Sequence, residues 1–280
     1  NQRSSHFDDV LIRGESGTVR GSLRIQEREY PLSAVSGVYN RMMDWQHIPE
    51  NEVIQHVSAY QSRIRKSAAI HDTLSQWFEV ADIPIMNRHS AMGSNVSKPY
   101  QAQFIRQAGF LTPTTLITND PERVRAFLKL HQRVIFKSIS SVRSVVKELD
   151  AEYLKELDRI RYLPTQFQAY VPGTNIRVHV TGYEVHATEI ISEAVDYRYA
   201  GDDGLSVTMR PIELPFDVAR RCLNLSTLLK LPLCGIDLKR TDDDQYYCFE
   251  VNPSPGYSYY QEYTGQPIAR GIVRYLTHLQ

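Results

Sequence analysis

Apolar residues along this chain recur with two different spacings, and each spacing predicts a different element. Apolar side chains three and four residues apart share one face of a helix, whereas apolar runs of four to eight residues between turn-forming residues are typical of strands. The helical spacing occurs in five stretches: 50–82, 97–108, 120–130, 216–230 and 265–279. The strand pattern occurs in nine: 9–14, 82–87, 111–118, 133–139, 164–171, 175–182, 183–192, 234–240 and 246–252.

Cap- and turn-forming residues indicate where several of these elements end. Ser97 is a suitable N-cap for the second helix, and Gly109 suits its C-terminal stop. The apolar stripe of this helix is expected to be Tyr100, Phe104, Ile105 and Ala108. Tight turns at residues 172–174 and 181–183 are expected to join consecutive strands.

The order of the elements predicts the fold class. Strands and helices alternate first and adjacent strands follow, which is typical of a mixed α/β (α+β) protein with two or three lobes. The pattern changes near residue 90, where we expect a small N-terminal α/β lobe to end. The chain has 280 residues, which is enough for more than one domain.

Composition narrows the class of partner. The chain is 42% hydrophobic and 23% charged, which favours a folded protein over long disorder. It has 32 Lys and Arg against 32 Asp and Glu, so its net charge predicts neither nucleic acid nor a membrane surface as a partner. No apolar run reaches the roughly 18 residues of a membrane span, and no signal peptide is visible.

The three cysteines, Cys222, Cys234 and Cys248, have no CxxC or Cys/His ligand spacing. An odd number without such spacing argues against a disulfide framework and against a zinc site. We therefore expect three core residues and a location in the reducing cytoplasm.

Residues 234–252 predict a β-hairpin around the turn-rich stretch TDDDQ. If the turn is centred between the last two of its three aspartates, Asp237 lies opposite Glu250, with their Cβ atoms about 4.5–5.5 Å apart. Glu250 and Asn252 share a face because strand side chains alternate. The residues expected to pack on the other face are Ile236, Leu238, Tyr247, Phe249 and Val251.

Asp237, Glu250 and Asn252 form a candidate metal site. Two opposed carboxylates repel each other unless a proton or a cation lies between them. Two acids and an amide offer oxygen ligands that suit Mg²⁺ or Mn²⁺. Two alternatives stay open: acidic residues also end strands where water is near, and the register could slip by one residue. After the strand, Gly256 is expected to let the backbone turn close to an acceptor pocket.

Four basic residues are candidates for contacts with phosphate. Lys137 interrupts an apolar strand, and burying a lysine without a partner is costly, so a nearby anion is expected. Lys98 lies in the first turn of its helix, where a bound phosphate would offset the unfavourable helix dipole. Arg177 and Arg198 lie in or beside strands, and arginine suits bidentate contacts with phosphate or carboxylate. Solvated lysines and surface salt bridges are the alternatives.

Sequence motifs of several other enzyme classes are absent. The chain contains no GxxxxGK[ST] phosphate loop, no GxGxxG after a strand, no HExxH and no GxSxG. The nine histidines are scattered, and His179 and His186, on adjacent predicted strands, are interpreted as structural or surface residues.

Six segments follow one another in a characteristic order: Lys98 in SKPYQAQFIRQAGF, Lys137 in VIFKSISS, then QFQAYVPGTNIRVHV, AVDYRYA, GIDL and FEVNPSPGY. Together they resemble the ATP-grasp superfamily, and within it the RimK-type carboxylate–amine ligases. The segment TPTTLITNDPERVRAF is also similar to the same stretch in graspetide macrocyclases, which crosslink peptide side chains. The resemblance covers roughly residues 85–275.

The resemblance implies how a nucleotide would bind. Lys98 and Lys137 would contact the phosphates of ATP. Adenine would be read at a hinge, through backbone groups of Ala169 and Val171. The hinge segment consists of Gln168, Ala169, Tyr170 and Val171.

The resemblance also implies the catalytic and metal-binding residues. Arg177 and Arg198 would hold the γ-phosphate and an acyl phosphate. Asp237, Glu250 and Asn252 would bind one or two Mg²⁺ ions (or Mn²⁺). A substrate carboxylate, from a small molecule or a peptide, would attack the γ-phosphate, and an amine or hydroxyl would then displace phosphate from the acyl phosphate. Such chemistry depends on positioning and charge neutralisation more than on a protein nucleophile.

The implied architecture is an ATP-grasp fold with three lobes. These are an N-terminal lobe over 1–90 and an ATP-grasp domain over 91–280, itself divided into a central lid lobe at about 110–172 and a C-terminal catalytic lobe at 173–280. The stretch before residue 85 is short for the usual N-terminal lobe, which leaves its completeness open. A homo-oligomer also stays open.

One departure from the family pattern supports other functions. The loop after Lys137 reads SISSVRS, without the glycines common in relatives. An ATP-binding regulatory module without ligation is therefore one alternative. A small-molecule kinase on the same fold is another.

Overall fold

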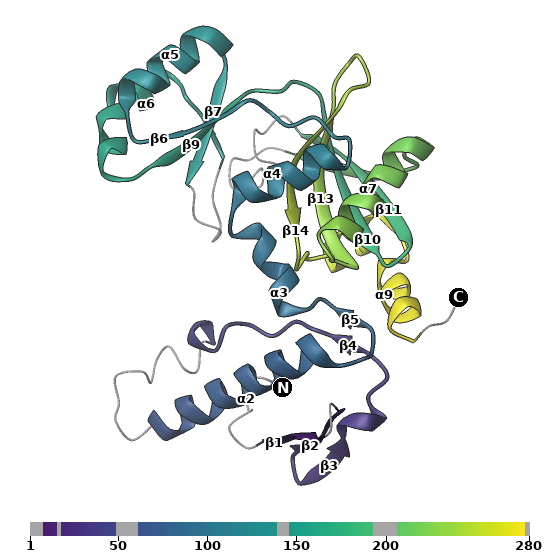
Figure 1. Ribbon diagram of the computed structural model, residues 1–280. Coiled ribbons are helices and arrows are strands. Elements are labelled where there is room, and N and C mark those ends of the chain that lie inside the picture. The colour runs from purple at the N-terminus through teal and green to yellow at the C-terminus, as the bar shows by residue number, and fades with distance from the viewer. Residues whose placement is uncertain (1–7, 16–17, 49–60, 139–145, 193–205, 278–280) are drawn as a thin grey trace. The chain divides into compact units, whose positions relative to one another are not determined.

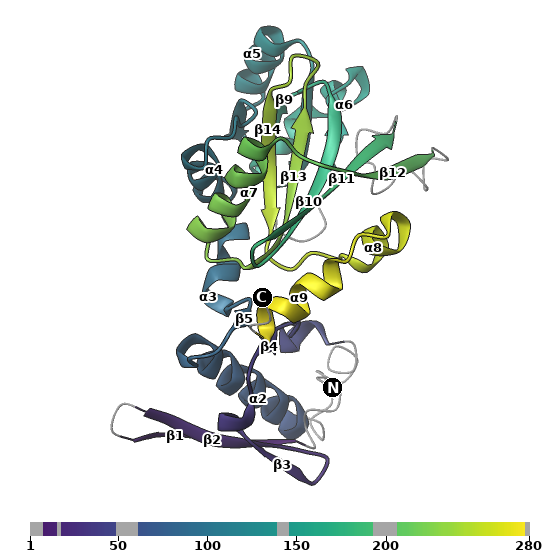
Figure 2. The same ribbon diagram turned by 90° about the vertical axis from the view of Figure 1, so that its right-hand side faces the viewer.

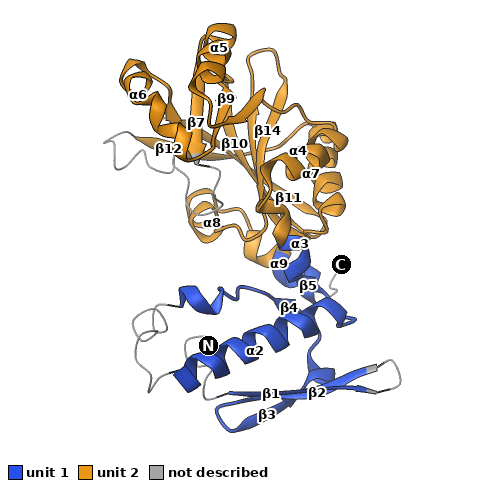
Figure 3. Ribbon diagram, turned by 60° about the vertical axis from the view of Figure 1, so that its left-hand side comes forward, with its two compact units in different colours: residues 1–92, 272–280 blue, residues 93–271 orange. Residues whose placement is uncertain are grey.

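The computed structural model describes residues 8–15, 18–48, 61–138, 146–192 and 206–277 (Figure 1). The fold is mixed α/β, as the sequence predicts. The chain forms two compact units, residues 1–92 with 272–280 and residues 93–271 (Figure 3). Among the described residues, no helix has the length and apolar character needed to cross a membrane.

The first unit packs a helix against an antiparallel meander. Its core contains Leu32, Trp77, Phe78 and Ile85, where the apolar face of the helix meets the strands. The expected strands 9–14 and 82–87 are present, the second shortened to two residues. The elements are β1 (Asp9–Glu15), β2 (Thr18–Ile25), β3 (Arg28–Pro31), β4 (Val38–Tyr39), α2 (Gln61–Val80), β5 (Ile85–Met86) and α3 (His89–Met92).

The second unit contains two sheets and the helices that cover them. The strands are β6 (Thr115–Thr118), β7 (Val134–Ser138), β8 (Lys147–Glu148), β9 (Thr165–Ala169), β10 (Thr174–Thr181), β11 (Glu184–Ser192), β12 (Val207–Ile212), β13 (Leu233–Arg240) and β14 (Tyr246–Asn252). The helices are α4 (Lys98–Gln107), α5 (Pro121–His131), α6 (Ala151–Lys155), α7 (Phe216–Leu228), α8 (Ser258–Thr264) and α9 (Ile268–Leu276), the last of which continues into the first unit.

A four-stranded sheet in the order β6-β9-β7-β8 has one apolar and one polar face. Val134 and Phe167 are buried with Val124 of α5 on the apolar face, which α5 and α6 cover (Figure 1). Lys137 and Gln166 are register partners and therefore share a face, and Phe167 points to the opposite one. The polar residues Lys137, Gln166 and Gln168 thus line the inner face of this sheet.

A five-stranded sheet in the order β12-β11-β10-β13-β14 forms the other half of the unit, and all its neighbours are antiparallel (Figure 2). Helix α7 buries Val218, Cys222 and Leu225 against one face. Tyr260 of α8 and Ile268 of α9 join Ile190 and Met209 on the opposite face. Both faces of the sheet are therefore partly covered, and the candidate site lies across β10, β13 and β14.

The expected ends of α4 are confirmed, but its expected apolar stripe is partly wrong. The Ser97 hydroxyl accepts a hydrogen bond from the Tyr100 N–H, and Gly109 ends the helix with a φ of 92°. Ile105 and Ala108 are buried, whereas Tyr100 is 48% exposed. Gln101, a polar residue, is buried in its place, because it meets backbone groups on β14.

The turn at 172–174 does not join paired strands. β9 belongs to the four-stranded sheet and β10 to the five-stranded sheet, so this segment crosses between two sheets. Gly173 allows the crossing, since its φ of 133° is unfavourable for residues with a Cβ. The turn at 181–183 does join paired strands, β10 and β11, as predicted.

The predicted hairpin register is confirmed at Asp237, which is paired with Glu250, but it shifts by one residue nearer the turn. Leu238 faces Cys248, so the irregularity leaves one extra residue, Phe249, in β14. The expectation that Phe249 and Tyr247 pack with Val251 is therefore wrong. Both are half-buried, and the buried residues of β14 are Tyr246, Cys248 and Val251.

Candidate active site

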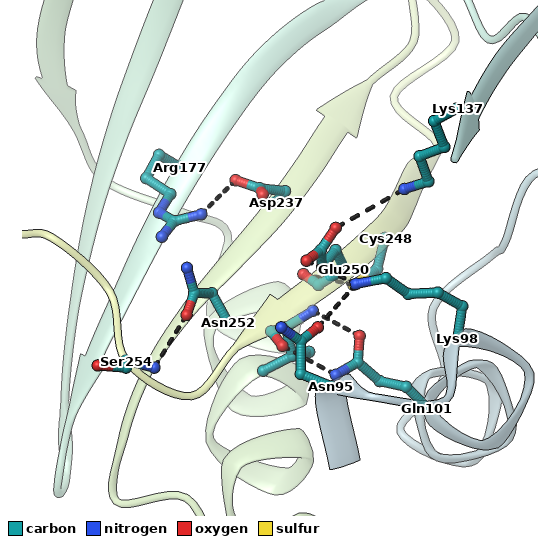
Figure 4. A network of polar contacts seen from close by, with 11 residues as sticks. Asn95, Lys98, Gln101, Lys137, Arg177, Asp237, Cys248, Glu250, Asn252 and Ser254 are labelled. Carbon is teal, nitrogen blue, oxygen red and sulfur yellow. Dashed lines mark hydrogen bonds and ion pairs between the residues drawn. The ribbon is translucent and has the colours of Figure 1, made fainter. Parts of the chain in front are cut away.

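A row of charged residues crosses three neighbouring strands of the five-stranded sheet. Arg177 of β10 is paired with Asp237 of β13, which is paired in turn with Glu250 of β14. The Arg177 Nη1 donates to the Asp237 Oδ1 at 2.6 Å (Figure 4). The side chain of Arg177 is 8% exposed, so the surface salt bridge that the sequence left open is excluded.

Two lysines from different elements meet the carboxylate at the end of this row. Lys98 Nζ of α4 lies 2.6 Å from Glu250 Oε1, and Lys137 Nζ of β7 lies 3.7 Å from Glu250 Oε2 (Figure 4). Only 12% of the Lys98 side chain and 9% of the Lys137 side chain are exposed, so neither is a solvated lysine. Lys98 also donates to the Asn95 Oδ1 at 2.7 Å. The structure thus brings both predicted phosphate contacts to one predicted metal ligand.

Asn252 lies on the same side of β14 as Glu250, opposite Gly235. Its Oδ1 accepts a hydrogen bond from the Ser254 N–H at 2.9 Å, which orients the amide while leaving the oxygen a second lone pair. Asp237, Glu250 and Asn252 therefore present oxygen donors from adjacent strand positions, a set that suits Mg²⁺. Among the described residues, no group of three His, Cys, Asp or Glu side chains is placed to hold a metal, so the amide is needed to complete this set.

Gly235 makes room for the arginine of the row. A Cβ atom added at this position would overlap the Arg177 guanidinium. Its φ is not in the left-handed region, so the space and not the backbone conformation requires glycine here.

The predicted hinge connects the two sheets. The Ala169 N–H donates to the Thr114 carbonyl at 2.9 Å, and the Tyr170 N–H donates to the Arg133 carbonyl at 3.0 Å. Because the Ala169 N–H is used within the fold, a contact from Ala169 to adenine would come from its carbonyl. The Gln168 Nε2 donates to the Thr115 hydroxyl at 3.0 Å, which holds its side chain on the inner face of the sheet.

The Tyr170 ring lies between two cations that the sequence reasoning did not single out. The Arg133 guanidinium is 3.7 Å from the ring centre and the Lys239 ammonium is 5.1 Å from it. Burial lowers the pKa of Lys239, and the charge of Arg133 lowers it further. Lys239 follows Asp237 by two residues, so the two-residue period of a strand could have placed it on this face.

Two adjacent cavities border these groups. The smaller, of about 110 Å³, is lined by Lys137, Tyr170, Asp237 and Glu250 among others. The larger, of about 710 Å³, extends from Lys98 along the inner face of the four-stranded sheet. Gln168 and Phe249 line both. Phe249 reaches them because the extra residue of β14 turns it away from the core.

His179 is a buried residue of this site whose position the sequence reasoning did not resolve. It lies two residues after Arg177 and opposite Gly235, fully buried, with its ring centre 4.8 Å from that of Tyr260. Burial lowers the pKa of His179 to about 3, and the neighbouring Arg177 charge contributes to this shift. The imidazole is therefore neutral and adds no charge beside Arg177.

Of two further expectations about this region, the structure does not test one and corrects the other. Arg198 lies outside the described residues, so the structure places ten of the eleven predicted site residues. Gly256 does not have a left-handed φ, so the backbone turn there does not need glycine. A Cβ atom at position 256 would meet no atom of the described residues within 4 Å, so the space beside Gly256 is open with respect to them.

Many solved structures share this fold, and three of them match nearly the whole chain. A Chryseobacterium gregarium RiPP-associated ATP-grasp ligase, in complex with ADP and a leader and core peptide, is 23% identical with a TM-score of 0.80, over 98% of this chain and 85% of that one. The ATP-grasp ligase PsnB, complexed with a phosphomimetic variant of minimal precursor, Mg and ADP, is 22% identical with a TM-score of 0.79, over 100% and 88%. Macrocyclase MdnC from Microcystis aeruginosa, bound with precursor peptide MdnA, is 20% identical with a TM-score of 0.78, over 97% and 87%.

At these identities the structural matches establish a common fold. None of the curated proteins compared with this chain matches it. The RimK-like ATP-grasp domain, however, matches residues 97–276, which contain both sheets and every candidate residue. This chain therefore belongs to the RimK-like ATP-grasp family, whose members are ligases.

Proposed function

We propose that this protein is an ATP- and Mg²⁺-dependent ligase that activates a carboxylate as an acyl phosphate and joins it to an amine or hydroxyl of a peptide. The observation that carries the proposal is the convergence of Lys98, Lys137 and Arg177 on the carboxylates of Asp237 and Glu250 beside the hinge. Three cations in ion pairs with two neighbouring carboxylates match the needs of a metal–nucleotide complex.

On the nucleotide side, the site supplies cations, backbone groups and apolar walls. Lys98 and Lys137 would transfer their contacts from Glu250 to phosphate oxygens. The carbonyl of Ala169 and the backbone of Val171 would contact adenine, with Ile135 and Leu238 of the cavity lining against its faces. Ligand pockets commonly measure about 300–1,000 Å³, so a nucleotide would use part of the larger cavity as well.

On the metal side, Asp237, Glu250 and Asn252 would hold one or two ions. Bound Mg²⁺ would neutralise charge on the phosphates during phosphoryl transfer. Once the lysines contact phosphate, Glu250 would act as a metal ligand. Arg177 would keep its contact with Asp237 and present its remaining N–H groups to the transferred phosphoryl group, and we assign the same task to Arg198.

The proposed substrate is a peptide. The solved structures with this fold include ligases in complex with precursor, leader or core peptides, which supports a peptide carboxylate and a peptide acceptor here. In the first step a carboxylate oxygen attacks the γ-phosphorus and ADP leaves. In the second step the acceptor nitrogen or oxygen attacks the acyl carbon, phosphate leaves with the C–O electron pair, and the acceptor loses its proton to water or buffer.

We propose the reducing cytoplasm as the compartment and the lobes 110–172 and 173–280 as the lid and catalytic lobes. Cys222, Cys234 and Cys248 are all free and buried, which supports the first proposal. Burial raises the pKa of each thiol, and for Cys234 it reaches about 12. Such thiols are unreactive core residues.

The test combines the full chain with ATP, Mg²⁺ and synthetic peptides rich in acidic residues, Lys, Ser and Thr. We expect release of ADP and phosphate only with peptide, and a product lighter than the peptide by one water. Hydroxylamine should trap the acyl phosphate as a hydroxamate. A stable phosphorylated product would indicate a kinase, and tight ATP binding without turnover would indicate a regulatory module. Either result would overturn the ligase proposal.

A further inference from the structure

The backbone of β14 is held at its outer edge by residues from outside the sheet. β14 stands at one end of the strand order, so its outward N–H and C=O groups need partners from outside the sheet. Val251, between Glu250 and Asn252, is fully buried. Unpaired peptide groups are costly at such a position, because no water replaces the missing bonds.

Gln101 of α4 satisfies both groups of this residue. Its Nε2 donates to the Val251 carbonyl at 2.8 Å, and its Oε1 accepts from the Val251 N–H at 2.8 Å (Figure 4). The side chain is 1% exposed. A primary amide here acts as one further peptide unit alongside the strand, although it lies 150 residues away in the chain.

The same edge has a second backbone partner on the far side of the irregularity at Phe249. The Leu111 N–H donates to the Tyr246 carbonyl at 3.2 Å, and the Cys248 N–H donates to the Leu111 carbonyl at 2.8 Å. Leu111 and Gln101 thus hold β14 on both sides of its extra residue. Glu250 lies between these two fixed points.

We propose that Gln101 is a positioning residue for the metal site, a role that rests on the proposed function of Glu250 and Asn252. By fixing the peptide groups of Val251, Gln101 sets the direction in which the two flanking side chains leave the strand. It touches neither substrate nor metal. Lys98, one turn earlier on α4, forms an ion pair with the Glu250 carboxylate. The same helix therefore contacts the Glu250 side chain through Lys98 and the backbone of the next residue through Gln101.

The chemistry of the contact favours glutamine over related side chains. Val251 offers one donor and one acceptor, and the partner must offer the opposite of each. Leucine has a similar size but neither group. Glutamate accepts from the N–H but places a charge against the carbonyl.

The test measures ADP affinity by calorimetry on the full chain, with and without saturating Mg²⁺. The variants are Q101L, Q101E and the control Q107L, which makes the same change at an exposed position of α4. For Q101L we expect ADP affinity without metal within about threefold of wild type, and a gain on adding Mg²⁺ that is about 10–100-fold smaller, the usual effect of losing a group that orients metal ligands. Q101E should lose less of this Mg²⁺-dependent gain in ADP affinity, and Q107L should lose none of it.

The outcomes separate the two proposals. If wild type gains no ADP affinity from Mg²⁺, both the metal site and the role of Gln101 are overturned. If wild type gains affinity and Q101L gains it equally, only the role of Gln101 is overturned. An equal loss of affinity with and without metal also overturns it, because that pattern indicates general structural damage. If Q101L does not fold, Q101E decides: a full Mg²⁺ gain in Q101E contradicts the proposal, and a reduced gain supports it.

Discussion

The two sheets of residues 93–271 hold their candidate functional groups in different ways. The five-stranded sheet carries Arg177, Asp237 and Glu250 as a row in which each side chain has a charged partner. The four-stranded sheet contributes Lys137, which reaches across to Glu250, and otherwise amides and backbone groups. The first sheet presents an array of paired charges, and the second presents the surface against which we propose that a nucleotide lies.

The difference has a physical origin in the residues that surround the functional groups of each sheet. Around the charges of the five-stranded sheet, Gly235 leaves space for Arg177, and His179 lies two residues after Arg177 on the same strand. At the edge of the sheet, Gln101 bonds the backbone of the residue between Glu250 and Asn252. Behind the polar face of the four-stranded sheet is an ordinary apolar core around Phe167. We therefore expect substitutions in the five-stranded sheet to disturb the chemistry sharply, even where they touch no ligand.

The most severe test removes the carboxylates of the row. Asp237→Asn with Glu250→Gln should lower ADP release at least about 1,000-fold, because two proposed metal ligands are lost and Lys98, Lys137 and Arg177 each lose an ion-pair partner. Initial rates with ATP, Mg²⁺ and peptide measure this. Asp242→Asn, in the exposed hairpin turn, is the matched control. Normal turnover in the double variant would refute the metal assignment.

A smaller effect is expected when a residue of the row is displaced by a steric clash and none of the row is removed. Gly235→Ala places a methyl group against the Arg177 guanidinium, so the arginine must move. Overpacking should cost about 1–3 kcal/mol of unfolding free energy, and displacement of the catalytic group should lower kcat about 10–100-fold. Urea denaturation and steady-state rates measure the two effects.

Gly93→Ala serves as the control for this variant, because its added Cβ would meet no atom within 4 Å. Full activity of Gly235→Ala would mean that the position of Arg177 is unimportant.

Gly256→Val tests whether the open space beside the row serves the acceptor. Among the described residues, no atom lies within 4 Å of a Cβ added at this position, so folding and ADP affinity should change little. Turnover with peptide should fall about tenfold, equivalent to about 1.4 kcal/mol of lost transition-state binding. Calorimetry with ADP and product formation with peptide give the two readings, and an equal loss in both would contradict the assignment.

The smallest expected effect is on stability, and it concerns how the free energy of unfolding changes with pH through His179. Its pKa is about 3 in the folded protein and near 6.5 when unfolded, so the unfolded chain binds the extra proton as pH falls below about 6.5. Between pH 7 and pH 5, the free energy of unfolding of the wild type should therefore fall by about 2 kcal/mol. The His179→Phe variant should not show this loss. Urea denaturation at both pH values compares them, and parallel losses in the two proteins would show that His179 is not the cause.

Much of the site could be predicted because strand alternation is local. The spacing of Glu250 and Asn252, and the position of Asp237 opposite Glu250, need only the hairpin and its turn. The same rule would have found Lys239 and His179, each two residues from a predicted site residue. The irregularity at Phe249 was missed because a single extra residue leaves the apolar pattern of the strand unchanged.

By itself, the sequence determined most of the long strands and helices, the order of the motifs and the pairing of the two carboxylates, because these depend on neighbours in the chain. It did not predict β2, β3, β12 or α8. The tertiary structure alone decided that Lys98 and Lys137 meet at Glu250, that Gly235 admits Arg177, and that Gln101 is buried instead of Tyr100. These contacts join residues far apart in the chain. They depend on how the elements pack, because backbone groups and charges that become buried need partners on other elements.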